Sequence, residues 1–189
     1  MRLALLLVPV ALLLAGCGTS QAPFRPAEKA PPQRFTLRWV EHYPEEQAAL
    51  VFGVQSFAVT ETGWSADISV ENRSDVGWEV GAPRFSLERA FGVLLFASGD
   101  LDELERRNRN GALPAIRNAT RYAPALPVVL EPGKTWSGTI SAPGPLAAGL
   151  WVRISFGTFT SVGDPPPGAE RRVVWFTDHT LRLKAEPTQ

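Results

Sequence analysis

From Phe35 onward, apolar and polar residues alternate along much of the chain, which is the pattern of half-buried β-strands. Phe35, Leu37 and Trp39 share one face of the first such segment. A Thr62-Gly63 turn predicts a hairpin, and a strict period of two follows it at Trp64, Ala66, Ile68 and Val70. The alternation therefore predicts β-structure from Phe35 to near the end of the chain.

Further alternating or short apolar segments give about eight or nine strands at spacings of roughly 8 to 14 residues, joined by Asn, Gly, Pro and Asp. They lie near residues 76–80, 85–87, 93–96, 126–130, 136–140, 150–156 and 172–184, the last expected as one strand. An all-β antiparallel sandwich with at most one short helix is the expected fold. That helix is Asp100–Asn108 (DLDELERRN), where Asp100 can cap the first turn and Glu103 follows three residues later.

Two stretches resemble known domains. Residues 131–156 (EPGKTWSGTISAPGPLAAGLWVRISF) look like the late strands of immunoglobulin-like domains, and residues 70–81 (VENRSDVGWEVG) are similar to a strand-turn-strand of extracellular bacterial modules of that class. Trp151 stands where many such domains have a corner tyrosine, and the Cys…Trp…Cys pattern is missing. The resemblance implies an immunoglobulin-like sandwich, and it concerns architecture rather than activity.

The N-terminus has a different pattern. Met1-Arg2 precedes an apolar stretch, Leu3 to Ala15, which is shorter than the roughly 20 residues that span a membrane and typical of a signal peptide. Leu14-Ala15-Gly16-Cys17 resembles the bacterial lipobox, which implies cleavage before Cys17 and attachment of diacylglycerol to its thiol. An ordinary signal peptide with a chance Cys, or an uncleaved anchor, are the alternatives.

Residues 18–33 (GTSQAPFRPAEKAPPQ) are polar and proline-rich and are expected to form a flexible tether. The predicted organisation is a signal peptide at 1–16, the lipidated Cys and tether at 17–33, and the sandwich at 34–186. The resemblance places the protein on the extracytoplasmic side of the bacterial envelope, with the membrane as partner through Cys17. This is the outer face of a plasma membrane, or the outer membrane where there are two, because Gly18 is not the Asp that resembles a retention signal.

Composition and motifs reduce the number of function classes that the chain could belong to. Lys plus Arg and Asp plus Glu both number 19, so there is no basic field that would favour nucleic acid. The single Cys forms no internal disulfide, and two His without HxxxH spacing do not make a usual zinc set. No Gly-x-Ser-x-Gly motif is present, and His42 and His179 have no local support as a catalytic pair. We therefore expect neither catalysis nor a metal or cofactor.

Two regions are candidates for contact with a partner. Parity places Trp151 and Arg153 on the face opposite Val152 and Ile154, and the alternative for Trp151 is a cap on the edge of the core or packing under a loop. The long stretch 100–127 carries Arg106 and Arg107, and a solvated loop is its ordinary interpretation. The sequons at Asn72 and Asn118 are interpreted as coincidental in a bacterial protein.

These observations predict a membrane-anchored envelope lipoprotein whose sandwich is a non-catalytic binding or scaffolding module for an envelope protein or a wall polymer. The alternative is a loop-mediated inhibitor or an accessory subunit of a membrane-associated enzyme. A third alternative is a packing subunit of a larger surface assembly.

Overall fold

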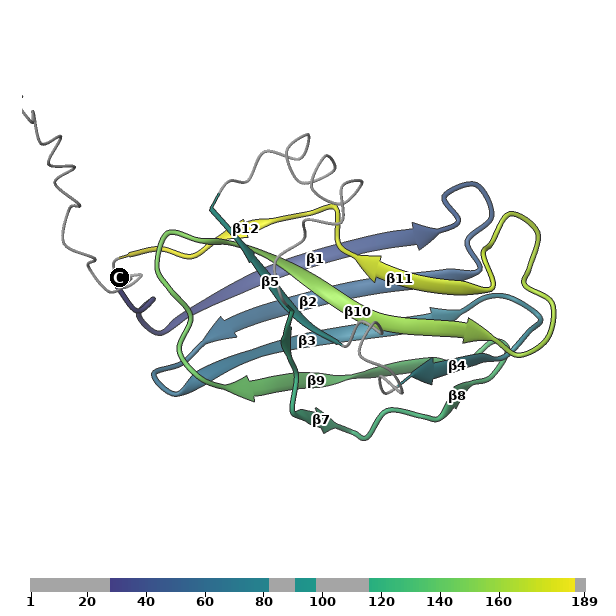
Figure 1. Cartoon of the computed structure of the whole chain (residues 1–189), viewed down its shortest axis with the longest axis horizontal. Coiled ribbons are helices and arrows are strands. Elements are labelled where there is room, and N and C mark those ends of the chain that lie inside the picture. Colours follow the sequence, from purple (N-terminus) through teal and green to yellow (C-terminus); the bar gives the residue numbers. More distant parts are fainter. Residues whose placement is uncertain (1–27, 82–90, 98–115, 186–189) are drawn as a thin grey trace, which may run out of the picture.

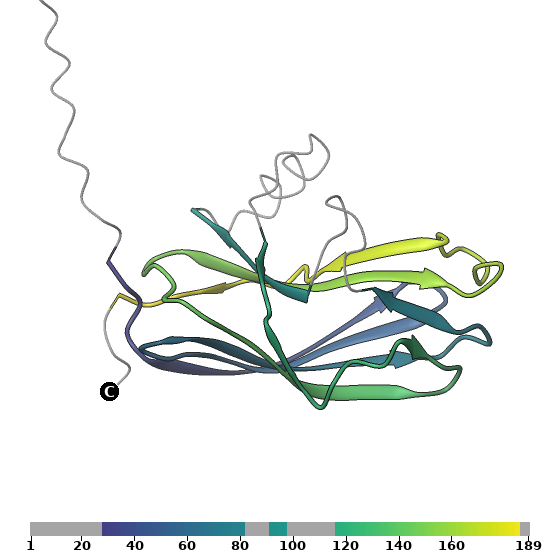
Figure 2. The same ribbon diagram turned by 60° about the horizontal axis from the view of Figure 1, so that its bottom comes forward.

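The computed structural model of the chain describes residues 28–81, 91–97 and 116–185, which form twelve strands and no helix. All strand pairs are antiparallel and belong to two sheets that face each other as a sandwich (Figures 1 and 2). The predicted all-β sandwich is therefore confirmed. The expected helix at Asp100–Asn108 and the expected strand at 85–87 lie outside the described residues.

The first sheet has the order β1-β2-β3-β9-β7. Its strands are β1 (Gln33–Tyr43), β2 (Leu50–Val59), β3 (Gly63–Asn72), β9 (Thr135–Pro143) and β7 (Arg121–Ala123). The predicted hairpin joins β2 to β3, and the Thr60 amide donates to the Gly63 carbonyl over 2.8 Å. A β-bulge interrupts the pairing of β1 with β2 between Thr36 and Trp39, and Arg38 within it has a φ of 59°.

The second sheet is built around β10 (Trp151–Ser161). Near its C-terminal end, at Thr158 to Thr160, β10 pairs with β4 on one side and with β11 on the other. At its start, Trp151 and Val152 pair with β5 on the β4 side and with β12 on the β11 side. The remaining strands are β4 (Trp78–Gly81), β5 (Phe91–Phe96), β6 (Arg117–Asn118), β8 (Val129–Leu130), β11 (Arg172–Phe176) and β12 (Leu181–Arg182). The single last strand predicted at 172–184 is wrong, because residues 177–180 leave the sheet between β11 and β12.

The core lies between the sheets and contains the side chains that the period of two placed inward. Trp64, Ala66, Ile68 and Val70 are each at most 2% exposed. Four phenylalanines from both sheets make ring contacts at its centre, Phe52, Phe91, Phe156 and Phe159. Burial of one such side chain contributes about 1.5–3 kcal/mol. Trp78 is also fully buried, while Trp39 and Trp175 are partly buried against this core.

The described chain begins and ends at one end of the sandwich (Figure 1). The Ala30 amide donates to the Leu146 carbonyl over 2.8 Å, and the Ala148 amide donates to the Glu28 carbonyl over 2.8 Å, both in the β9–β10 connection. The Lys184 amide donates to Oε1 of Gln33 over 2.9 Å. Contacts with the sandwich are therefore also made by residues before 34, the position at which the sandwich was expected to begin.

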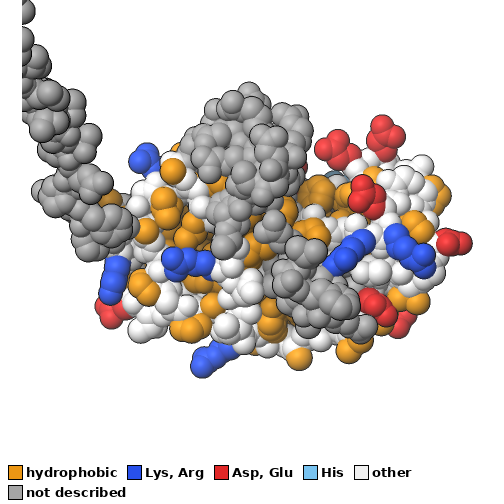
Figure 3. Space-filling view, viewed as in Figure 1, with side chains coloured by type: hydrophobic (Ala, Val, Ile, Leu, Met, Phe, Trp, Pro, Cys, Tyr) orange, Lys and Arg blue, Asp and Glu red, His pale blue; other side chains and the backbone are white. Residues whose placement is uncertain are grey.

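Charge is unevenly distributed over this elongated shape. On the face drawn in Figure 3, most of the acidic side chains lie toward the end opposite the chain termini, and basic side chains are prominent around the end that carries them. The molecule is formally neutral overall, so this is a separation of charge rather than an excess.

Candidate functional site

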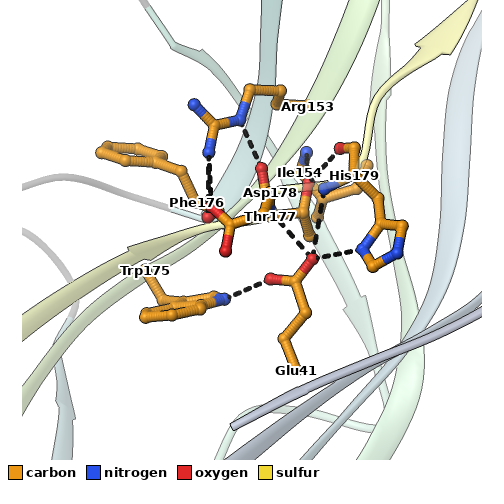
Figure 4. A network of polar contacts seen from close by, with 8 residues as sticks. All are labelled: Glu41, Arg153, Ile154, Trp175, Phe176, Thr177, Asp178 and His179. Atoms are coloured by element: carbon orange, nitrogen blue, oxygen red, sulfur yellow. Dashed lines mark hydrogen bonds and ion pairs between the residues drawn. The ribbon is translucent and has the colours of Figure 1, made fainter. Parts of the chain in front are cut away.

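A polar cluster joins the edge strand β1 of the first sheet to the β11–β12 connection of the second (Figure 4). At its centre is Glu41, which is 8% exposed. One carboxylate oxygen, Oε2, accepts from Nε1 of Trp175 over 2.7 Å. The other, Oε1, accepts from the amides of Asp178 and His179 over 2.9 and 3.3 Å and lies 2.8 Å from Nδ1 of His179. Glu41 therefore holds three groups on the facing edge of the second sheet: the Trp175 side chain on β11, the backbone of residues 178 and 179, and the His179 imidazole.

The imidazole of His179 has a second neighbour on β1. It stacks on the indole of Trp39, with ring centroids 5.3 Å apart and an interplanar angle of 20°. The His179 side chain is 53% exposed, so the stack and the Glu41 contact hold a ring that is open to solvent on one side. A protonated ring in this position forms an ion pair with Glu41, and a neutral ring with hydrogen on Nδ1 forms a hydrogen bond.

The opposite side of the same loop is held by Arg153 of β10. Its guanidinium donates from Nε to the Thr177 carbonyl and from one terminal nitrogen to the Phe176 carbonyl over 3.3 Å. That nitrogen also lies 3.3 Å from Oδ1 of Asp178. Thr177 adds a hydroxyl that accepts from the Ile154 amide over 3.1 Å and donates to the His179 carbonyl over 3.0 Å. The loop between β11 and β12 is thus fixed from both faces, by Glu41 and by Arg153.

The pKa of Asp178 is shifted by its surroundings in this cluster. Partial burial and the negative charges of Glu41 and Glu45 raise the pKa of its carboxyl, and Arg153 and His179 only partly oppose them. The protonated form of Asp178 is therefore favoured in the folded protein relative to a free aspartate.

An open cleft of about 200 Å³ adjoins the cluster and is lined by Glu41, His42, Glu45, Trp175 and Asp178. It lies between the C-terminal end of β1 and the β11–β12 loop, and its wall combines carboxylate oxygens with an indole. The contacts of Glu41 and Arg153 hold the Trp175 and Asp178 part of this wall in place, which reduces the ordering that a ligand bound there would require.

Trp151 and Arg153, which the sequence proposed for binding, do not line this cleft. Trp151 is partly buried on the outer face of the second sheet, where it packs on the cluster of Leu94 and Phe96. The predicted parity is confirmed, since Val152 and Ile154 are in the main core. Arg153, however, is only 7% exposed and holds the β11–β12 loop, so it is not on an open contact surface. Arg106, Arg107 and Cys17 lie outside the described residues.

Sequence reasoning did not identify Glu41. The alternation predicted the first strand from Phe35 to Trp39, whereas β1 extends to Tyr43 and includes Glu41. A signal was present: Glu41 has the inward parity of Trp39 and Tyr43, and a charged residue at an inward position needs partners. His179, which has no local support in the sequence as a catalytic partner of His42, pairs with Glu41 in the structure.

Among residues 28–81, 91–97 and 116–185, no three His, Cys, Asp or Glu side chains are grouped as metal ligands. The same residues contain no helix with the length and hydrophobicity to span a bilayer. No family model, curated protein or solved structure matches the chain.

Proposed function

We propose that the chain is a bacterial envelope lipoprotein, anchored through a diacylglycerol on Cys17, whose immunoglobulin-like sandwich is a non-catalytic binding module for an envelope protein or wall component. The observation that carries the binding role is the open cleft beside Glu41, of which Trp175 and Asp178 are held by hydrogen bonds. It lies eight residues along β1 from Gln33, or roughly 26 Å, while the chain arrives from its N-terminus at the Gln33 end. An anchor on Cys17 would therefore join the sandwich at the end of β1 that is remote from the cleft.

The chemistry of the cluster supports binding over catalysis. A hydroxyl nucleophile needs a base that takes its proton. The hydroxyl of Thr177 donates to the backbone carbonyl of His179 rather than to its imidazole. Trp175, held by Glu41, and the exposed Glu45 instead offer an apolar face and a carboxylate at the cleft, which are groups that can position a partner.

Anchoring is tested with Cys17→Ala in cells supplied with labelled fatty acid. The parent chain is expected to take up label and to fractionate with membranes, and the variant is expected to take up none. Ser20→Ala, three residues beyond the motif, is the matched control and should behave as the parent. Label retained by Cys17→Ala would refute the lipid attachment.

The binding role is tested by a photo-crosslinking amino acid placed at Glu45, on the cleft. Gln55 is the matched control because it is exposed on the outer face of the first sheet. A discrete adduct from position 45, missing from position 55, is expected in intact cells. Equal adducts from both positions, or a hydrolytic activity lost in His179→Ala, would overturn the proposal.

A further inference from the structure

Within the described part of the chain, six exposed cations surround the end of the sandwich at which that part begins. They come from segments far apart in the sequence: Lys29, Arg34, Arg117, Arg121, Arg182 and Lys184. Three carboxylates accompany them, Glu28, Glu61 and Asp67, and Asp67 is already paired with Arg34 over 3.6 Å. The described residues of this end therefore carry a net positive charge.

Pairing between strands brings these cations together. Lys29 bridges Ala147 in the β9–β10 connection, and Arg117 donates to the carbonyl of Pro145 in that same connection over 3.0 Å. Arg182 lies opposite Trp151 at the start of β10. The backbone of Lys184 bonds to the side chain of Gln33 at the start of β1. These four cations thus belong to backbone segments that are joined at one end of the molecule.

The other end has the opposite charge. Its loops present exposed carboxylates at Glu45, Glu46, Asp75, Glu131, Asp164 and Glu170. The cations among its described residues are fewer, namely Arg73, Lys134, Arg171 and Arg172. Figure 3 shows this separation on one face, with acidic side chains concentrated away from the chain termini.

We infer that the basic end is a docking surface for an anionic lipid bilayer, which holds the sandwich end-on with its acidic loops outward. The inference rests on the proposed anchor, because Cys17 is eleven residues before Glu28 and that length of chain reaches at most about 40 Å. A basic surface held this close is within reach of the headgroups, where each Lys or Arg is attracted to anionic lipid over about a Debye length. The acidic end is repelled by the same surface, so both ends favour one orientation.

Orientation is measured on the full lipidated chain in vesicles of phosphatidylcholine, with or without 30% phosphatidylglycerol. A fluorophore is attached at Ala185→Cys, near the basic end, or at Val162→Cys, near the acidic end, and a headgroup-labelled lipid quenches it. Both positions are exposed and neither substitution changes charge. We expect stronger quenching at 185 than at 162 in the anionic vesicles, and a smaller difference in the neutral vesicles or in 0.5 M salt.

Charge variants test which residues cause the orientation. Arg182→Gln with Lys184→Gln should remove the lipid-dependent quenching difference, whereas Lys134→Gln with Arg171→Gln, at the far end, should retain it. Equal quenching in both lipids, or equal loss in both double variants, would overturn the inference. Flotation with vesicles reports anchoring separately: a chain that does not float refutes the proposed anchor, and one that floats without preferred orientation refutes this inference alone.

The unlipidated Cys17→Ala chain gives a measurement independent of the anchor. Its apolar leader binds both compositions, so only the ratio of binding to anionic and to neutral vesicles is informative. That ratio should fall about tenfold or more with Arg182→Gln and Lys184→Gln, given the attraction of each charge to an anionic surface. A ratio unchanged by these substitutions would contradict the inference.

Discussion

Oε1 of Glu41 lies 2.8 Å from Nδ1 of His179, a contact between residues 138 positions apart. It joins the edge strand of one sheet to the edge loop of the other. At the far end of β1, Gln33 makes the equivalent connection to the backbone of Lys184. Polar side chains at inward positions of β1 therefore close this side of the sandwich, where hydrophobic packing ends.

Glu41→Gln should destabilise the fold by about 2–3 kcal/mol, because both carboxylate oxygens accept from donors and the amide nitrogen cannot accept. Urea unfolding followed by tryptophan fluorescence measures the change. Glu45→Gln is the matched control: it removes the same charge from the same cleft but at an exposed position, and should cost less than about 0.5 kcal/mol. Equal losses in the two variants would show that only net charge matters.

Asn72→Ala should cost about 2–3 kcal/mol, since Asn72 is completely buried and its amide connects the two sheets. Its Nδ2 donates to the carbonyls of Val76 and Leu130 over 2.8 and 2.9 Å, and its Oδ1 accepts from Ser74. Thermal unfolding measures the loss. Asn118→Ala, at an exposed strand position, should leave the midpoint nearly unchanged, and a similar shift in both variants would contradict the structural role.

The sequence predicted features that depend on neighbouring residues and missed features that depend on residues far apart in the chain. Alternation at Trp64 to Val70 depends on which face of a strand is buried, so it identified β3 directly. Glu41 was missed because its partner His179 lies 138 positions away on the other sheet, and the same holds for the contact of Asn72 with Leu130, 58 positions away. The break between β11 and β12 was missed for a different reason: Val173 and Leu181 keep one parity across it, so the alternation is that of one continuous strand.

Gly157→Ala should cost about 2–4 kcal/mol. The φ of Gly157 is 71°, and a Cβ there would lie 2.7 Å from Cδ2 of Phe91, a ring that is 1% exposed. Gly163→Ala separates the two causes, because Gly163 has a φ of 93° and a Cβ added there would have nothing within 4 Å. Chemical denaturation should show the smaller loss for position 163, and equal losses would mean that Phe91 moves without cost.

Asp67→Asn tests a pH-dependent contribution on the outer face of the first sheet. Hydrogen bonds from the hydroxyls of Ser56 and Thr139, both 2.6 Å, lower the pKa of Asp67, and Arg34 adds a smaller effect. A carboxyl with a lowered native pKa stabilises the fold above its unfolded value of 3.8, and this contribution is lost as the pH falls through the native pKa. The variant should therefore be less stable than the parent by about 1 kcal/mol at pH 7, with the gap closing toward pH 2. Urea unfolding of both proteins across this range measures the gap, and exposed Asp75→Asn should show little difference from the parent at any pH. A gap for Asp67→Asn that stayed constant from pH 7 to pH 2 would mean that the carboxylate charge contributes nothing and that the substitution acts through packing.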